Sequence, residues 1–168
     1  PLGSVMKIVT SLAVLNEGVY SLDTRYTCNG LWNRDIVRVD WLPGGHGTQT
    51  TQDALTHSCN PFYYEAGFML NQYNPFTLPT YARNMGLGVL TGIQDIEEEQ
   101  GLIIDPDWKA RLSSIPWNFS DAVNMSIGQG EVQVTPLQVT RMVAAIANGG
   151  QMIRPELVWK AGLLGEAP

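Results

Sequence analysis

Ser4 and Lys7, three residues apart at the front of an apolar run, are the first side chains in this sequence that could do chemistry together. On a helix, residues at positions i and i+3 share one face about 5 to 6 Å apart, so the lysine amine can reach the serine hydroxyl. A serine becomes a strong nucleophile only when a base takes its proton, and burial among apolar neighbours favours a neutral lysine. The pair therefore predicts a serine nucleophile with a lysine base.

This pair needs a helix to hold it, and residues 4–17 are apolar on nearly every side, as in a helix at the centre of a domain. Ser4 fits the N-cap, where helix N–H groups favour negative charge, and Gly18 fits the position after the last turn. Ser-x-x-Lys also arises by chance, so a capping serine with Lys7 extended toward water is the alternative. Pro-Leu-Gly-Ser also resembles a tag-cleavage scar, but the match of Lys7 and its helix to the same motif argues against that origin.

A second polar pair, Ser58 and Asn60, follows about fifty residues later in Ser58-Cys59-Asn60-Pro61. The residue before a proline is pushed out of the helical region, so we expect a non-helical turn between helices over residues 50–57 and 62–72. Such a turn can present a hydroxyl that passes a proton and a carboxamide that holds a substrate amide. The alternative is a turn whose side chains bond only the local backbone.

The remaining elements must place these two pairs together. Residues 19–51 predict turns and one small hairpin, and residues 78–85 predict a short helix. Residues 86–120 predict a long surface excursion with a short helix near 108–112, and residues 126–130 predict a flexible loop. Thr135, Pro136 and Gln138 form a strong start for a second core helix over residues 136–148, before a short apolar tail beyond Pro155. We see no linker or repeat, so residues 1–168 predict one domain.

Composition excludes several classes of protein. The 168 residues are 44% hydrophobic and 15% charged, which is typical of a globular domain. A net charge of −6 argues against a nucleic-acid partner. No apolar stretch approaches the ~20 residues that span a bilayer, and we expect no targeting segment in this chain. Cys28 and Cys59 could pair or remain thiols, and we favour unpaired thiols.

Taken together, these segments resemble the transpeptidase domain of penicillin-binding proteins, which carries Ser-x-x-Lys, Ser-x-Asn and Lys-Thr-Gly motifs. The segments that carry the resemblance are Gly3–Thr10, His57–Asn60 with Phe62–Tyr64, Gly86–Gly88 with Thr91–Gly92, and Ser126–Gly130 through Thr135–Gln138 to Ala144–Pro155. The resemblance implies that Ser4 is the acylated nucleophile and Lys7 its base. It also implies that Ser58 relays a proton and that Asn60 binds the substrate amide.

The third motif of that family is missing, because no Lys-Thr-Gly or Lys-Ser-Gly triplet occurs in the chain. We therefore expect a mainly α fold, the helical half of a serine β-lactamase/penicillin-binding-protein-like transpeptidase domain, with little β and most of the central sheet missing. The helix from Ser4 should then expose an apolar face. Leu2, where a second proline is common, is a small departure from the family pattern.

The resemblance implies a parent protein that is a peptidoglycan D,D-transpeptidase, acting on D-Ala-D-Ala stem peptides and acylated by β-lactam antibiotics. The isolated chain should be weak or inactive. The parent should be membrane-anchored at the extracytoplasmic face of a bacterial membrane, alongside other cell-wall synthesis proteins and without cofactor or metal, and the class B type is favoured over class A. A non-catalytic penicillin sensor or scaffold is the alternative. A serine β-lactamase ranks lower, because we can name no deacylating carboxylate.

Overall fold

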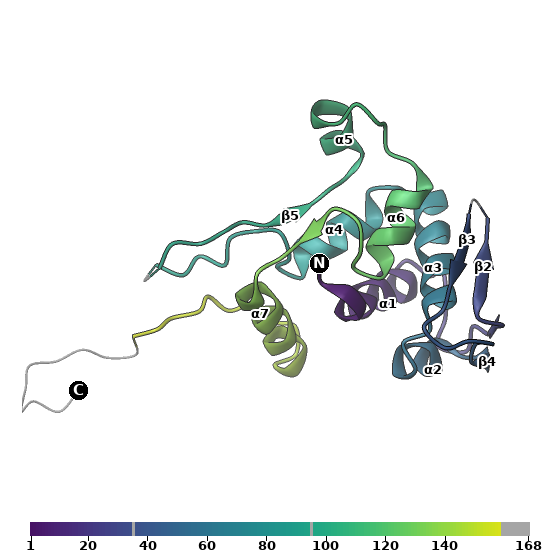
Figure 1. The fold of residues 1–168 in the computed structure, drawn as a ribbon. Coiled ribbons are helices and arrows are strands. Elements are labelled where there is room, and N and C mark those ends of the chain that lie inside the picture. The colour runs from purple at the N-terminus through teal and green to yellow at the C-terminus, as the bar shows by residue number, and fades with distance from the viewer. Residues whose placement is uncertain (35, 95, 159–168) are drawn as a thin grey trace, which may run out of the picture.

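The computed structural model describes residues 1–34, 36–94 and 96–158, and they form a mainly helical body with three small two-stranded antiparallel sheets (Figure 1). The helices are η1 Gly3–Val5 (a 3-10 turn), α1 Met6–Asn16, α2 Thr51–Thr56, α3 Asn60–Tyr73, α4 Thr77–Asn84, α5 Pro106–Leu112, α6 Phe119–Ser126 and α7 Pro136–Ala147. The strands are β1 Tyr26–Cys28, β2 Leu31–Asn33, β3 Val37–Val39, β4 Gly47–Gln49, β5 Leu102–Ile103 and β6 Val132–Gln133. The expected mainly α fold with little β is confirmed. None of the described helices is long and apolar enough to cross a membrane.

Helix α1 lies at the centre of this body, as predicted, and packs against α3, α4 and α6. Its buried apolar side chains join those of α3 and α4 in one core that includes Met6, Val9, Ala13, Val14, Ala66, Leu70, Leu78 and Ala82. Each large apolar side chain buried this way stabilises the fold by about 1.5–3 kcal/mol. On the opposite side of α1, Leu12 remains 40% exposed.

Helix α6, which the sequence analysis did not predict, packs closely along α3. A Cβ on Gly67 of α3 would lie 2.7 Å from Ser126 Cβ, so only glycine allows this approach. The Ser126 hydroxyl is fully buried and donates to the Tyr63 carbonyl at 2.7 Å. The prediction of a flexible loop over 126–130 is therefore wrong at Ser126, which is the last residue of α6. The overlooked signal was a capping box formed by Asn118 and Asp121.

The region between α1 and α2 contains two nested strand pairs rather than one hairpin. Strands β2 and β3 form the inner hairpin, with Trp32 opposite Arg38, and β1 pairs with β4 outside it, with Thr27 opposite Thr48. The outer pair was missed because its strands are separated by about twenty residues. This nesting brings Cys28, at the end of β1, toward the start of α3.

Residues 86–120 are only partly a surface excursion. The predicted short helix is present as α5, but Leu87, Ile103 and Ile104 are buried, and β5 pairs with β6. Gln138 ties this region to α7, because its carboxamide accepts from Gly88 N at 3.1 Å and donates to the carbonyls of Val89 and Gln100, each at 2.9 Å.

Helix α7 starts as predicted, with Thr135 as N-cap and Gln138 closing a capping box. The prediction that it is a second core helix is right only in part, because Met142 joins the main core but most of the apolar face does not. Among its apolar side chains only Met142 and Ala145 are buried, whereas others such as Ile146 remain about half exposed. Figure 1 shows α7 at the margin of the body. The predicted tail beyond Pro155 lies largely outside the described residues.

Candidate active site

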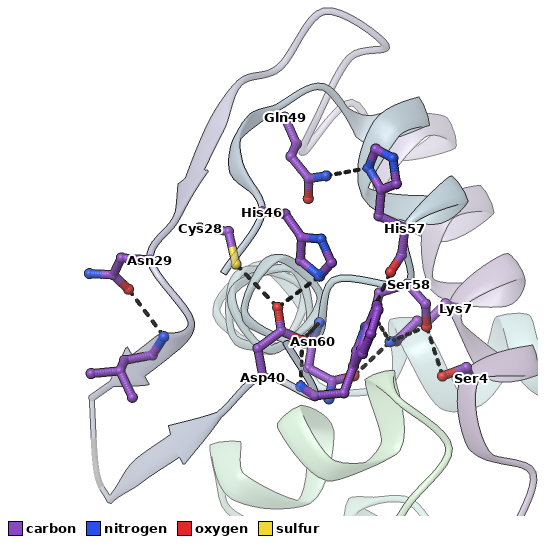
Figure 2. A network of polar contacts seen from close by, with 12 residues as sticks. Ser4, Lys7, Cys28, Asn29, Asp40, His46, Gln49, His57, Ser58 and Asn60 are labelled. Atoms are coloured by element: carbon purple, nitrogen blue, oxygen red, sulfur yellow. Dashed lines mark hydrogen bonds and ion pairs between the residues drawn. The ribbon is translucent and has the colours of Figure 1, made fainter. Parts of the chain in front are cut away.

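The structure brings Ser4, Lys7, Ser58 and Asn60 into one network (Figure 2). Lys7 Nζ donates to Ser58 Oγ at 2.8 Å, to the Ser58 carbonyl at 2.7 Å and to Asn60 Oδ1 at 2.6 Å. The Ser58 hydroxyl in turn donates to Ser4 Oγ at 2.9 Å. The Ser58 hydroxyl therefore lies between the Lys7 amine and the Ser4 hydroxyl. The contact between Ser4 and Lys7 that the helical spacing predicted is indirect and is made through Ser58.

Ser4 is held by its backbone, and the prediction that it is an N-cap is wrong. It lies inside the 3-10 turn η1, whose N-cap is Leu2 and has no side-chain cap bond. The preceding Gly3 donates its N–H to the Gly128 carbonyl at 3.0 Å. A Cβ on Gly128 would approach Gly3 O to 2.3 Å, so this loop fits against the start of η1 only because it has glycine there. The exposed Ser4 hydroxyl is therefore free of a capping role and meets Ser58 instead.

Ser58 has φ of 55°, the one positive value found at a non-glycine residue of the described chain. This conformation costs on the order of 1 kcal/mol and persists only where the surroundings hold it. Lys7 supplies part of that support by donating to both oxygens of Ser58. Asn60 differs from the prediction, because it is the first residue of α3 and does not lie on the turn. The side chains of Ser58 and Asn60 both accept hydrogen bonds from Lys7, in contrast to the alternative in which they bond only the local backbone.

Lys7 is fully buried, in contrast to the alternative in which it extends to water. Burial lowers the pKa of Lys7 from 10.5 to about 8, and the negative charge of the nearby Asp40 carboxylate opposes that shift. With this pKa, about one lysine in ten is neutral at pH 7. A neutral amine accepts a proton, and rotation of the two serine hydroxyls reverses the donors along the same three atoms. The geometry can therefore carry a proton from Ser4 through Ser58 to Lys7.

Asp40 is a site residue that the sequence analysis missed. Its Oδ1 accepts from the backbone N–H of Asn60 at 3.1 Å and from that of Trp41 at 2.8 Å, which fixes the first residue of α3. Its charge is also the largest factor that raises the pKa of Lys7 against burial. An aspartate between two turn-rich segments gives no local signal for this role. Only the fold brings it to the Ser-x-Asn segment.

Beside Asp40 the structure gathers further groups of the kinds that bind metals. Cys28 Sγ, Cys59 Sγ and an Asp40 carboxylate oxygen all lie within 4.8 Å of one another and are buried. His46 Nε2 lies 3.1 Å from Asp40 Oδ2, and this buried nitrogen makes no hydrogen bond among the described residues. In tetrahedral zinc sites the donors are roughly 3.3–3.8 Å apart, since zinc–ligand distances are about 2.0–2.3 Å. Cys28, Cys59 and Asp40 therefore bring together donor types that zinc prefers, and His46 contacts the carboxylate, although the sequence analysis named no metal ligand.

The fold is that of the transpeptidase domain of penicillin-binding proteins. The structure of Pseudomonas aeruginosa PBP2 in complex with WCK 5153 superposes with a TM-score of 0.86 at 28% identity, over 93% of this chain and 36% of that one. The family model described as the penicillin binding protein transpeptidase domain matches residues 1–162, and the chain belongs to this family.

Two further relatives are similar over most of the chain. Peptidoglycan D,D-transpeptidase MrdA of Acinetobacter baumannii is 29% identical over 161 residues, which are 94% of this chain and 24% of that protein. PBP2 of Helicobacter pylori in its complex with MreC has a TM-score of 0.84 at 27% identity, over 92% of this chain and 28% of that one. The chain thus spans about a quarter of the length of the curated relatives that it matches.

Proposed function

We propose that the protein to which this chain belongs is a peptidoglycan D,D-transpeptidase with Ser4 as its nucleophile. The observation that carries the proposal is the contact series from Ser4 through Ser58 to a buried Lys7 with a pKa of about 8. It occurs in a member of the penicillin-binding protein transpeptidase family, and the relative from Acinetobacter baumannii is named as a peptidoglycan D,D-transpeptidase. Residues 1–168 then form part of one such domain.

In this mechanism Ser4 Oγ attacks the carbonyl between the two D-alanines of a stem peptide. Its proton passes to Ser58, whose own proton passes to neutral Lys7. The same path returns a proton to the terminal D-alanine as its C–N bond breaks, which leaves an ester on Ser4. An amine from a second stem then attacks the ester and forms the crosslink. β-Lactams acylate Ser4 by the same first step.

Asn60 orients the substrate in this proposal. Its Oδ1 already accepts from Lys7 at 2.6 Å, so its Nδ2 is the group that donates to a substrate carbonyl. The proposed site therefore uses the two halves of one carboxamide differently, one to hold the base and one to hold the substrate. The backbone N–H of the same residue donates to Asp40, which keeps the carboxamide in place.

The biological setting follows from this activity. Crosslinking of peptidoglycan places the protein at the extracytoplasmic face of a bacterial membrane, held there by an anchor. The complex of Helicobacter pylori PBP2 with MreC supports other cell-wall synthesis proteins as partners. Both the location and such partners are parts of the proposal.

The test is a transpeptidation assay on the full-length protein with a stem pentapeptide that ends in D-Ala-D-Ala and an acceptor amine. The wild-type protein should release D-alanine and form the crosslinked product, and Ser4→Ala should do neither. Ser114→Ala, which changes an exposed serine between α5 and α6, is the matched control and should retain activity. A Ser4→Ala protein that still crosslinks would refute the proposed nucleophile.

A further inference from the structure

Tyr63 lies directly against the base of the proposed active site. It belongs to α3, its side chain is fully buried, and Lys7 Nζ lies over its ring, 5.4 Å from the centroid. A cation within about 6 Å of an aromatic ring is attracted by the negative charge of the ring face. The mechanism proposed above gives this ring no part, although it faces the nitrogen that takes the proton.

The same residue contacts α1 at a second point, one turn further along. Its hydroxyl shares a hydrogen bond with Ser11 Oγ at 2.7 Å, and Ser11 follows Lys7 by four residues on the same face of α1. On α3, Asn60 precedes Tyr63 by three residues and accepts from Lys7 at 2.6 Å. One face of α3 thus holds one face of α1 at two points, which fixes the ring against the amine.

The hydrogen bonds of Lys7 leave a specific role for the ring. The three N–H groups of an ammonium are matched by three acceptors, which are the carbonyl and hydroxyl oxygens of Ser58 and Oδ1 of Asn60. A further partner can stabilise the positive charge only if it needs no additional N–H group, and an aromatic face meets this condition. The ring also cannot take the proton, so it does not compete with Lys7 as the base.

We propose that Tyr63 is a positioning residue of the transpeptidase reaction, whose ring stabilises the ammonium that forms when Lys7 accepts a proton from Ser58. The inference rests on the proposed function, because it concerns the same proton transfer. Positive charge develops on Nζ during that step, and an aromatic face that is already in place favours this charge without rearranging. The rate of acylation should therefore depend on the electron density of the ring, even at a pH where Lys7 starts neutral.

The other titratable groups near Lys7 keep their charges when the ring is changed. The Asp40 carboxylate raises the pKa of Lys7. Cys59 is a free thiol, as the sequence analysis favoured, and burial raises its pKa, so it carries no charge. Burial also raises the pKa of Tyr63 to about 12, so the phenol stays neutral over the range in which Lys7 titrates. A change in the ring electrons therefore alters one interaction of the amine and leaves the others as they are.

The experiment changes the electrons of the ring and keeps its shape. Tyr63→Phe and versions of it with one, two or three fluorine atoms on the ring are made in the full-length protein, and labelling by excess fluorescent penicillin is timed between about pH 6 and pH 10. Each fluorine withdraws negative charge from the ring face, so the ammonium form of Lys7 is favoured less. We expect the plateau rate at high pH to fall stepwise, by about threefold to tenfold in total, and the midpoint of the pH profile to fall by about 0.5–1 unit.

Phe62 provides the matched control. It is the neighbouring ring on α3, it is equally buried, and it packs against Tyr20 and Tyr26. Fluorination of Phe62 should leave both the plateau rate and the midpoint unchanged. Tyr63→Phe without fluorine keeps the aromatic face and loses only the bond to Ser11, so it should retain most of the wild-type rate.

A plateau rate and a midpoint that stay constant along the fluorine series would overturn the inference, and so would an equal change when Phe62 is fluorinated. Ser4→Ala, measured beside the series, separates this result from a failure of the proposed function. A Ser4→Ala protein that is still labelled contradicts the proposed nucleophile. An unlabelled Ser4→Ala protein together with a flat fluorine series contradicts only the role of Tyr63.

Discussion

Lys7 should set the pH at which Ser4 becomes reactive. Burial lowers the pKa of Lys7 to about 8, and only the neutral amine can accept the proton that passes from Ser4 through Ser58. The rate of acylation by a β-lactam should therefore rise as the pH increases through about 8 and level off above it. A solvated lysine would place the same rise near pH ~10.4.

The size of the effect follows from the neutral fraction. With a pKa of about 8, that fraction is about one tenth at pH 7, one half at pH 8 and nine tenths at pH 9. The rate should increase about fivefold between pH 7 and pH 8 and less than about twofold between pH 8 and pH 9. A lysine with an ordinary pKa would instead give about a tenfold increase for each of these two steps.

The assay is the time course of labelling of the full-length protein by excess fluorescent penicillin, followed from about pH 6 to pH 10. Lys7→Arg is the control, because a guanidinium stays protonated throughout this range. It should lower the rate by about 10²–10⁴-fold and abolish the rise. A wild-type rate that is flat from pH 7 to pH 9, or that still rises tenfold above pH 8, would refute the assignment of Lys7 as the base.

Three further substitutions test other parts of the account. Ser58→Ala removes the hydroxyl between Lys7 and Ser4, so penicillin labelling should slow by about 10²-fold or more, and an unchanged rate would exclude the relay. Gly67→Ala should lower the free energy of unfolding by about 1–3 kcal/mol, because the new Cβ would lie 2.7 Å from Ser126 Cβ. Helix propensity alone predicts that the same substitution raises the free energy of unfolding, so urea unfolding decides between the two effects. Thr135→Ala removes the N-cap of α7 and should lower the free energy of unfolding, measured in the same way, by about 1 kcal/mol. An unchanged free energy of unfolding would mean that the cap does not stabilise the fold.

Local signals in the sequence predicted local structure well. Thr135 was expected to cap α7, and its side chain accepts the predicted bond from the Gln138 N–H, because capping depends on residues within one turn. Gly18 follows the end of α1 with a positive φ, as its position indicated, and Gly86 follows the end of α4 in the same conformation. The family resemblance supplied the mainly α fold, which the relatives confirm.

Contacts between distant residues were out of reach of such signals. The pairing of β1 with β4, the burial of Ser126 against α3 and the position of Asp40 beneath Asn60 all depend on the whole fold. Helical spacing alone predicted a direct contact between Lys7 and Ser4. The tertiary structure instead inserts Ser58 between them, because residues 58–60 pack onto α1 from a segment about fifty residues away.

The central claim is that Ser4 is the acylated residue, and the most direct test is to map the adduct. The full-length protein is incubated with a penicillin and digested, and the peptide that carries the added mass is fragmented in a mass spectrometer. The account predicts that the adduct lies on Ser4 and disappears in Ser4→Ala. An adduct on Ser58 or on any other residue, or the absence of any adduct from the folded wild-type protein, would contradict it.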